Sequence, residues 1–141
     1  MKRALVIDDN EVFRSTLVAL LDDLHFECVA VETPEEARDV ILRERFDVIL
    51  CDLILRMGIS PDDDDELDAS VMVGLNTIHE LSKNCVGTPI IAMSGVVQGE
   101  ALAAIEKFGA VDRLSKPFGL KELENALNRV MNPLPSGAYT A

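Results

Sequence analysis

Asp47-Val48-Ile49-Leu50-Cys51-Asp52-Leu53 is the stretch that decides the fold, because its apolar run ends abruptly in a carboxylate. Four consecutive apolar residues between charged ones, two of them β-branched, are typical of a strand that is buried on both faces of a sheet. Asp52 is then expected at the carboxyl end of this strand. In open parallel sheets this is the end at which ligands bind.

Further apolar runs repeat this pattern, and amphipathic segments separate them. The predicted strands are 4–7, 28–31, 48–51, 90–93 and 111–114. Apolar residues at helical spacing predict helices at 11–24, 34–41, 75–81, 100–108 and 120–131. The helix at 34–41 also has a start signal in Thr33-Pro34-Glu35-Glu36, with a capping Thr and a Pro in the first helical position. This alternation predicts parallel strands joined by right-handed crossovers. The expected fold is α/β, a doubly wound five-stranded parallel sheet in the flavodoxin-like order 2-1-3-4-5, with helices on both faces.

A chain of 141 residues is long enough for one domain with one substantial core. Residues 1–132 are expected to form it, and residues 133–141, which are rich in Pro, Gly and Ser, are expected to form a flexible tail. Residues 54–72 have no clear period and contain the acidic run 62–66, which predicts an exposed loop.

The net charge of −12 repels nucleic acid and anionic membranes, so direct binding to either is not expected. The four apolar residues before Asp8 are too few for a signal peptide, and no apolar segment approaches the length that spans a membrane. The cytoplasm is therefore the expected location. The three cysteines lack metal-ligand spacing and are interpreted as reduced packing residues.

Polar side chains follow four of the five predicted strands: Asp8 and Asp9 the first, Asp52 the third, Ser94 the fourth and Lys116 the fifth. The first and third strands are neighbours in the flavodoxin-like order, so the three carboxylates would crowd together. Two like charges about 4 Å apart repel by roughly 4 kcal/mol at an effective dielectric constant of about 20, which calls for a counter-charge. Oxygen ligands with no His or Cys nearby favour Mg²⁺ over zinc.

A metal on carboxylates, a hydroxyl and a lysine make a site that is suited to phosphoryl transfer. Mg²⁺ and Lys116 would neutralise the phosphoryl oxygens, Ser94 would donate a hydrogen bond to one of them, and Asp52 would attack in line to give an aspartyl phosphate. Taken singly, each residue has a structural explanation as a helix cap, a turn residue or a surface lysine. Their joint occurrence at four strand ends favours one shared site.

Asp8-Asp9 after the first strand, Asp52 after the third, Ser94-Gly95 after the fourth and Lys116-Pro117-Phe118 after the fifth form an ordered set of motifs. By their order and spacing, over about residues 3–131, the chain resembles the receiver domains of two-component response regulators. The resemblance implies that a sensor histidine kinase or a histidine phosphotransfer protein phosphorylates Asp52. It also implies Mg²⁺ on Asp8, Asp9, Asp52 and the backbone carbonyl of Ile54, a cis bond between Lys116 and Pro117, and hydrolysis of its own phosphoryl group.

Such a domain is a phosphorylation-dependent switch that acts on a downstream protein effector. The surface of the fourth helix, the fifth strand and the fifth helix is where this contact is expected. A single-domain regulator is the preferred interpretation, because few residues follow the last helix. A receiver fragment of a longer regulator, joined through the Pro-rich residues 133–137, is the alternative.

The sequence departs from the family pattern in two places. The glycine that the family has shortly after the acceptor corresponds to Gly74, 22 positions after Asp52, which leaves an acidic insertion at about 56–72. The simpler interpretation is a solvated insertion, and the sharper one is a partner-docking or metal-sensitive lid. Arg113 stands where the family generally has Tyr or Phe that turns inward on activation. A guanidinium cannot replace that burial without a partner for its charge, and the simpler interpretation is a solvent-facing arginine.

Other functions remain open from the sequence. An unphosphorylated pseudo-receiver could act purely as a binding module. A magnesium-dependent aspartyl-phosphate phosphatase would need its nucleophile after the first strand with a second Asp two residues on, whereas Asp8 and Asp9 are adjacent. A flavodoxin would share the fold, but two carboxylates after the first strand would repel the phosphate of FMN.

Overall fold

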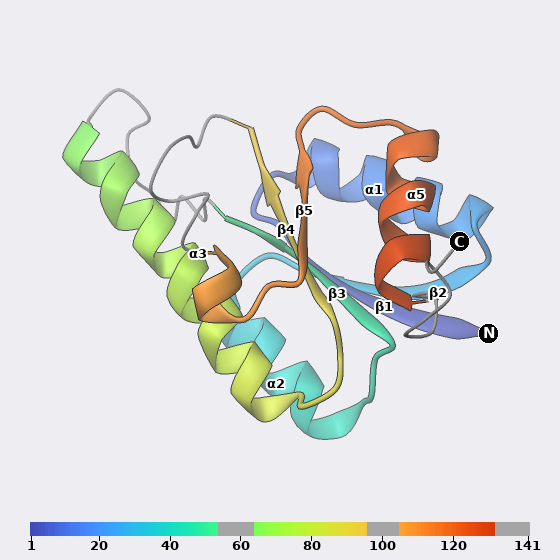
Figure 1. The fold of residues 1–141 in the computed structure, drawn as a ribbon, viewed down its shortest axis with the longest axis horizontal. Coiled ribbons are helices and arrows are strands. Elements are labelled where there is room, and N and C mark those ends of the chain that lie inside the picture. Colours follow the sequence, from blue (N-terminus) through green and yellow to red (C-terminus); the bar gives the residue numbers. More distant parts are fainter. Residues whose placement is uncertain (54–63, 96–104, 132–141) are drawn as a thin grey trace, which may run out of the picture.

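A computed structural model describes residues 1–53, 64–95 and 105–131, with side chains from residue 72 onward in the second of these segments. Five parallel strands form one sheet in the order β2-β1-β3-β4-β5, with helices on both faces (Figure 1). This confirms the predicted fold class and strand order. The strands are β1 (Lys2–Ile7), β2 (Phe26–Val31), β3 (Val48–Asp52), β4 (Ile90–Ser94) and β5 (Asp112–Ser115). The helices are α1 (Glu11–Asp23), α2 (Pro34–Arg43), α3 (Asp64–Asn84) and α5 (Leu120–Met131), and residues 105–108 are also helical.

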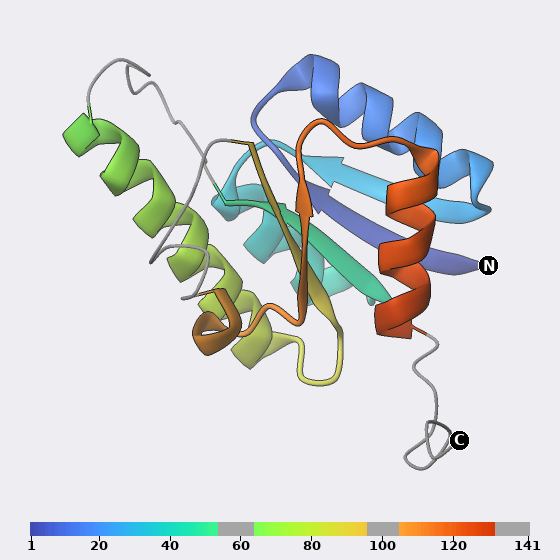
Figure 2. The ribbon, with the colours of Figure 1, turned by 45° about the horizontal axis from the view of Figure 1, so that its top comes forward.

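Alternate residues of the strands pack into two separate apolar layers, because successive side chains of a strand point to opposite faces. Figure 2 shows α1 and α5 on one face of the sheet and α2 and α3 on the other. The layer under α2 and α3 includes the strand residues Leu5, Ile7, Val31, Ile49, Cys51, Ile90 and Ala92. The layer under α1 and α5 includes Ala4, Val6, Val48, Leu50, Ile91, Met93 and Leu114. β3 is buried over its whole length, as its uninterrupted apolar run predicts.

Side-chain caps fix the starts of α1 and α2. Asn10 caps α1, with its side-chain oxygen accepting a hydrogen bond from the Phe13 amide at 2.9 Å. Thr33 caps α2, where its hydroxyl accepts from the Glu36 amide and donates to the Glu36 carboxylate, each at 3.2 Å. The start signal of α2 in the sequence is therefore confirmed.

The loop predicted over 54–72 is wrong in its second half, because α3 begins at Asp64. Carboxylates are favoured in the first turn of a helix by the helix dipole, so an acidic run can open a helix as well as form a solvated loop. With 21 residues α3 is about 30 Å long, and in both views its first turns extend past the carboxyl ends of the strands. None of the helices in the described segments combines the length and the apolar character needed to cross a membrane.

Gly74 explains how α3 packs against the end of β3. A Cβ atom at this position would lie 1.8 Å from the carbonyl oxygen of Leu53, which is backbone and cannot turn away. Only glycine lets the helix approach so closely to the residue that follows Asp52. The structure thus gives a physical reason for a glycine at Gly74, despite the long connection that precedes it.

Some helix predictions are corrected or lie partly outside the described residues. Of the helix predicted over 100–108, residues 105–108 are helical, and the remainder is outside the described segments. Gly109 ends that helix with φ +119°, in the left-handed region that favours glycine. Leu120 was placed in the apolar stripe of α5 but is exposed, since it starts the helix at the rim of the layer that Leu123 and Leu127 fill. The predicted tail 133–141 is also outside the described residues.

Candidate functional site

Three carboxylates meet at the carboxyl ends of β1 and β3. Asp8, Asp9 and Asp52 each offer an oxygen atom, and these atoms lie within 4.8 Å of one another. The sheet brings them together, because the strands are parallel neighbours and Ile7 is paired with Cys51. Asp8 has no exposed surface and Asp52 is 5% exposed, whereas Asp9 is half-buried. The predicted carboxylate cluster is therefore present in the structure.

Lys116 brings positive charge to this cluster from the end of β5. Its Nζ atom lies 2.7 Å from Oδ2 of Asp8 and 3.2 Å from Oδ2 of Asp52. Its backbone amide donates to the Ser94 carbonyl at 2.7 Å, which ties the residue to the end of β4. The Lys116–Pro117 peptide bond is cis, as the resemblance implied. Lys116 thus bridges two strand-end carboxylates.

Ser94 ends β4, next to the strand that carries Asp52. It is buried, and the pairing of Asp52 with Met93 and of Ser94 with Ser115 places it at the same edge of the sheet as the carboxylates. The Leu53 amide donates to the Met93 carbonyl at 2.8 Å, which continues the β3–β4 pairing beyond Asp52. The five residues that the sequence singled out, Asp8, Asp9, Asp52, Ser94 and Lys116, therefore share one end of the sheet.

The segment between β1 and α1 supports Asp8 from behind. The Asn10 amide donates to Oδ1 of Asp8 at 2.8 Å, and a guanidinium nitrogen of Arg14 donates to the Asp8 carbonyl at the same distance. Oδ2 of Asp8 accepts from Lys116. Asn10 therefore both caps α1 and orients a carboxylate of the site.

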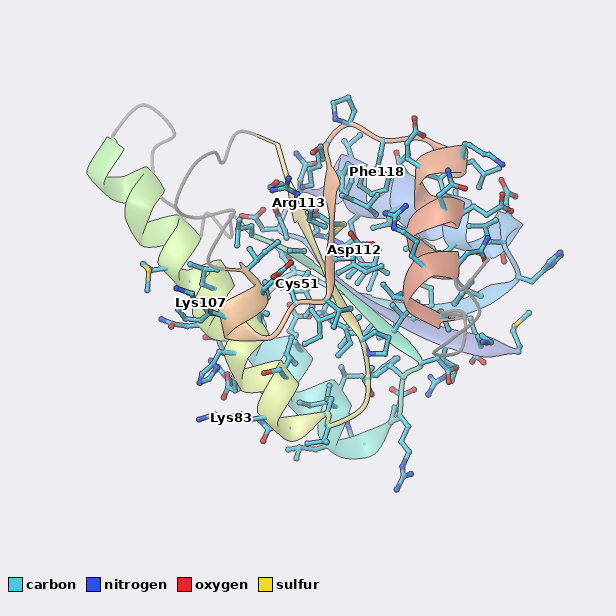
Figure 3. All side chains as sticks on the ribbon, in the orientation of Figure 1. Cys51, Lys83, Lys107, Asp112, Arg113 and Phe118 are labelled. Carbon is cyan, nitrogen blue, oxygen red and sulfur yellow. The ribbon has the colours of Figure 1, made fainter. Side chains whose placement is uncertain are left out.

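Two phenylalanines form an apolar wall beside the Lys116 ammonium. Its Nζ atom lies 4.1 Å from the centre of the Phe13 ring, and Phe13 meets Phe118 edge to face with ring centres 5.4 Å apart. Figure 3 shows Phe118 on the segment that joins β5 to α5. Periodicity alone carries no signal for a contact between Phe13 and a lysine more than a hundred positions later.

Cys51 lies directly before Asp52 but is a packing residue. Burial raises the pKa of its thiol, and the neighbouring carboxylates of Asp52 and Asp8 raise it further. The thiol therefore stays protonated and is a poor nucleophile and metal ligand. Burial also raises the pKa of Cys28 to about 11 and raises the pKa of Cys85. The three cysteines are free, which agrees with their interpretation as reduced packing residues.

Arg113 and Ile54 are the two remaining residues that the sequence predicted for the site. Arg113 lies on β5, where Figure 3 labels it, and is exposed, which agrees with the simpler interpretation of a solvent-facing arginine. Its neighbour in the adjacent strand is Ala92. Ile54, the implied carbonyl ligand, lies outside the described residues.

The donor set fits a hard divalent cation. Two of the three carboxylates are buried, and the Lys116 ammonium pairs with Asp8 and Asp52. Clustered carboxylate oxygens are the ligands of Mg²⁺, which keeps several waters besides one or two protein carboxylates. The half-buried position of Asp9 leaves the cluster within reach of solvent.

Comparison with known proteins gives the same family for most of the chain. The chain is 30% identical over 141 residues to the regulatory protein VirG of Agrobacterium fabrum, with 99% of this chain and 50% of that protein covered. It is 28% identical over 123 residues to a response regulator receiver protein of an Anaeromyxobacter strain, with 87% and 46% covered. The chain spans about half the length of these curated relatives. No family model matches the chain.

Solved structures of receiver domains superpose on almost all of this chain. The chemotaxis protein CheY4 of Vibrio cholerae has a TM-score of 0.76 at 26% identity, with 92% of this chain and 98% of that one covered. The receiver domain of the sensor histidine kinase PA1611 of Pseudomonas aeruginosa, solved with a magnesium ion in its active-site cleft, has a TM-score of 0.73 at 26% identity, with 93% and 98% covered. By sequence and by fold, the chain is a receiver domain of the response-regulator type.

Proposed function

We propose that this receiver domain is a phosphorylation-dependent switch whose acceptor is Asp52. The observation that carries the proposal is the position of Asp52, buried at the end of β3 with Asp8 and Asp9 within 4.8 Å and with the Lys116 ammonium 3.2 Å away. A carboxylate in such a setting has beside it both oxygen ligands for a metal and a fixed cation. Both are requirements of a site that transfers a phosphoryl group.

The phosphoryl donor in this proposal is a phosphohistidine of a sensor histidine kinase or of a histidine phosphotransfer protein. An oxygen of Asp52 attacks the phosphorus in line as the P–N bond breaks, and the electron pair of that bond returns to the imidazole ring of the donor. The product is a mixed anhydride on Asp52. Lys116 stabilises the charge on the phosphoryl oxygens, and a magnesium ion on Asp8, Asp9 and Asp52 would supply Lewis-acid neutralisation of the same charge.

Ser94 is the second group with a role in the switch. In this proposal its hydroxyl donates a hydrogen bond to a phosphoryl oxygen on Asp52, and its position at the end of β4, the strand next to the one that carries Asp52, supports this role. The signal then passes to a downstream protein through the outer surface of the domain. The exposed position of Arg113 supports a signalling role only through a contact that the arginine makes with a partner, since nothing of its charge is buried here.

Incubation with acetyl phosphate or beryllofluoride, with and without Mg²⁺, tests this function. With acetyl phosphate the wild-type protein is expected to gain one phosphoryl group, seen as a mass increase, only when Mg²⁺ is present. Asp52→Asn should abolish the modification and beryllofluoride binding. Asp39→Asn is the matched control, since Asp39 is an exposed carboxylate on α2. Modification that survives Asp52→Asn, or that fails in the wild type, would contradict the proposal.

The same experiment separates the alternatives. A pseudo-receiver that acts only as a binding module would show no Asp52-dependent modification under any condition. An aspartyl-phosphate phosphatase would turn over a small phosphomonoester such as p-nitrophenyl phosphate, and that activity would survive Asp52→Asn and be lost in Asp8→Asn.

A further inference from the structure

The Lys116 ammonium has an aromatic neighbour as well as its two carboxylates. Its Nζ atom lies 4.1 Å from the centre of the Phe13 ring, well within the range at which a cation is attracted to the face of an aromatic ring. The lysine side chain is 18% exposed, so water screens this attraction only weakly. Phe13 itself is half-buried at the start of α1.

Asn10 links the backbone of Phe13 to the side chain of Asp8. The Phe13 amide donates to the side chain of Asn10 at 2.9 Å, and the Asn10 amide donates to Oδ1 of Asp8 at 2.8 Å. Lys116 then closes a ring of contacts, because it pairs with Oδ2 of Asp8 and lies over Phe13. The Phe13 ring also makes an edge-to-face contact with Phe118, with ring centres 5.4 Å apart.

Strand parity explains why these groups meet. Val6, Leu50 and Leu114 belong to the apolar layer under α1 and α5, and Asp8, Asp52 and Lys116 each follow two positions later. Continuing the alternation of each strand points these three side chains toward the layer that contains α1. Phe13 is the large α1 residue packed at that end of the layer.

We propose that Phe13 is a positioning residue, whose ring holds the Lys116 ammonium between Asp8 and Asp52 where a phosphoryl group on Asp52 meets it. This inference rests on the proposed function, since it assigns to Lys116 the phosphoryl oxygens as a ligand. A lysine has a long flexible side chain, and holding it in one place removes conformational freedom that would otherwise be lost when the phosphoryl group binds. The preorganised ammonium then binds the phosphoryl group more tightly.

Phe13→Leu removes the aromatic face but keeps an apolar side chain of similar size against the layer. The affinity for beryllofluoride at saturating Mg²⁺, measured by calorimetry, is expected to fall about 3- to 30-fold, the range of a partly buried cation–π contact. The affinity for Mg²⁺ alone should stay unchanged or increase, because a less firmly held Lys116 competes less for the carboxylates. Phe13→Tyr keeps the ring and should restore the beryllofluoride affinity.

Two control variants separate positioning from general loss of packing. Val40→Ala leaves a cavity under α2, in the opposite layer, and should lower stability without changing either affinity. Phe118→Leu removes the edge contact but keeps the Phe13 ring under the ammonium, and should affect beryllofluoride binding less than Phe13→Leu does. An equal effect of Phe118→Leu, or loss of both affinities in parallel in Phe13→Leu, would overturn the inference.

A direct readout of the contact between Lys116 and Phe13 distinguishes a failure of this inference from a failure of the proposed function. The methylene protons next to Nζ of Lys116 lie near an aromatic face, so their NMR resonances should be shifted upfield in the wild type and move toward ordinary lysine positions in Phe13→Leu. Identical Lys116 resonances in the two proteins would overturn the positioning role. A wild-type protein that binds no beryllofluoride while Phe13→Leu still moves these resonances would contradict the proposed function and leave the role of Phe13 intact.

Discussion

The two ends of the sheet both carry clusters of charge around one cation, and they differ in how that charge is balanced. At the amino end, the Arg3 guanidinium bonds to Glu44, lies 3.8 Å from Glu27 and lies over the Phe46 ring with 5.1 Å to its centre. At the carboxyl end, Lys116 pairs with Asp8 and Asp52 and likewise lies over a phenylalanine ring. The local pattern of contacts is nearly the same at both ends.

Burial separates the two clusters. The Glu27 and Glu44 side chains are 61% and 36% exposed, so water solvates the negative charge that Arg3 does not neutralise. The hydrogen bond to Glu44 raises the pKa of Arg3, so the guanidinium keeps its positive charge. Asp8 and Asp52 are buried, so water solvates their carboxylates far less than those of Glu27 and Glu44. The comparison indicates that the burial of the charged groups, rather than their number, distinguishes the carboxyl end.

The largest expected difference between the two ends is in the effect of removing the cation of each cluster. Lys116→Met is expected to slow phosphorylation of Asp52 by acetyl phosphate about 100-fold or more, as loss of a preorganised group that stabilises transition-state charge does. Arg3→Met should leave the rate unchanged and lower stability only slightly, since exposed ion pairs contribute little. Rates from mass spectrometry check both. Equal rates in the two variants would mean that the burial difference has no catalytic meaning.

Glycine-to-alanine substitutions should lower the free energy of unfolding more at the tightly packed carboxyl end than at the amino end. Gly74→Ala drives a methyl group into the Leu53 carbonyl and should lower the free energy of unfolding by about 3 kcal/mol or more. Gly87, in the turn before β4 at the amino end, has φ +90° but open space around it, so Gly87→Ala should lower stability by only about 1–2 kcal/mol from backbone strain. Urea unfolding measures both. A Gly74→Ala protein as stable as Gly87→Ala would show that α3 can move away from Asp52 without loss.

Magnesium should stabilise the fold through the carboxyl end alone. At a concentration of about 100 times its dissociation constant, Mg²⁺ should raise the unfolding free energy of the wild type by about 2.7 kcal/mol. Asp9→Asn should reduce this gain, and Glu44→Gln, an acid-to-amide change at the amino end, should preserve it. Unfolding with Mg²⁺ and with chelator tests the difference, and a gain that Glu44→Gln removes would place the ion at the wrong end.

The smallest effect concerns alkaline stability. Burial raises the pKa of Cys28 from 9.0 to about 11, so the native state keeps its proton where the unfolded chain has lost it. This contribution to stability is complete below about pH 9 and is lost as the pH rises toward 11. Cys28→Ser should therefore show a shallower fall of the urea midpoint between these pH values.

Thiol reagents should also modify Cys85 at the amino end before the fully buried Cys51.

Periodicity and strand-end residues were enough to predict the sheet, its order and the shared carboxylate site. The apolar run 48–51 could be recognised because a strand buried on both faces needs no polar alternation. The start of α3 was not predicted correctly. The acidic run that includes Asp64 has no apolar stripe, and such a run is compatible both with a solvated loop and with the first turn of a helix. The spacing of apolar residues in α5 also does not show that Leu120 is exposed, because it does not indicate where the buried layer ends.

The sequence by itself determined which polar residues share one end of the sheet, because Asp8, Asp9, Asp52, Ser94 and Lys116 follow strands whose carboxyl ends must meet in a parallel sheet. Only the tertiary structure decided how they are held. The Phe13 ring under the Lys116 ammonium and the contact of Gly74 with Leu53 join residues from separate elements, and no local pattern encodes such contacts. Local sequence fixes the period and the ends of each element, whereas packing between elements fixes distances and burial, on which the balance of charge at the site depends.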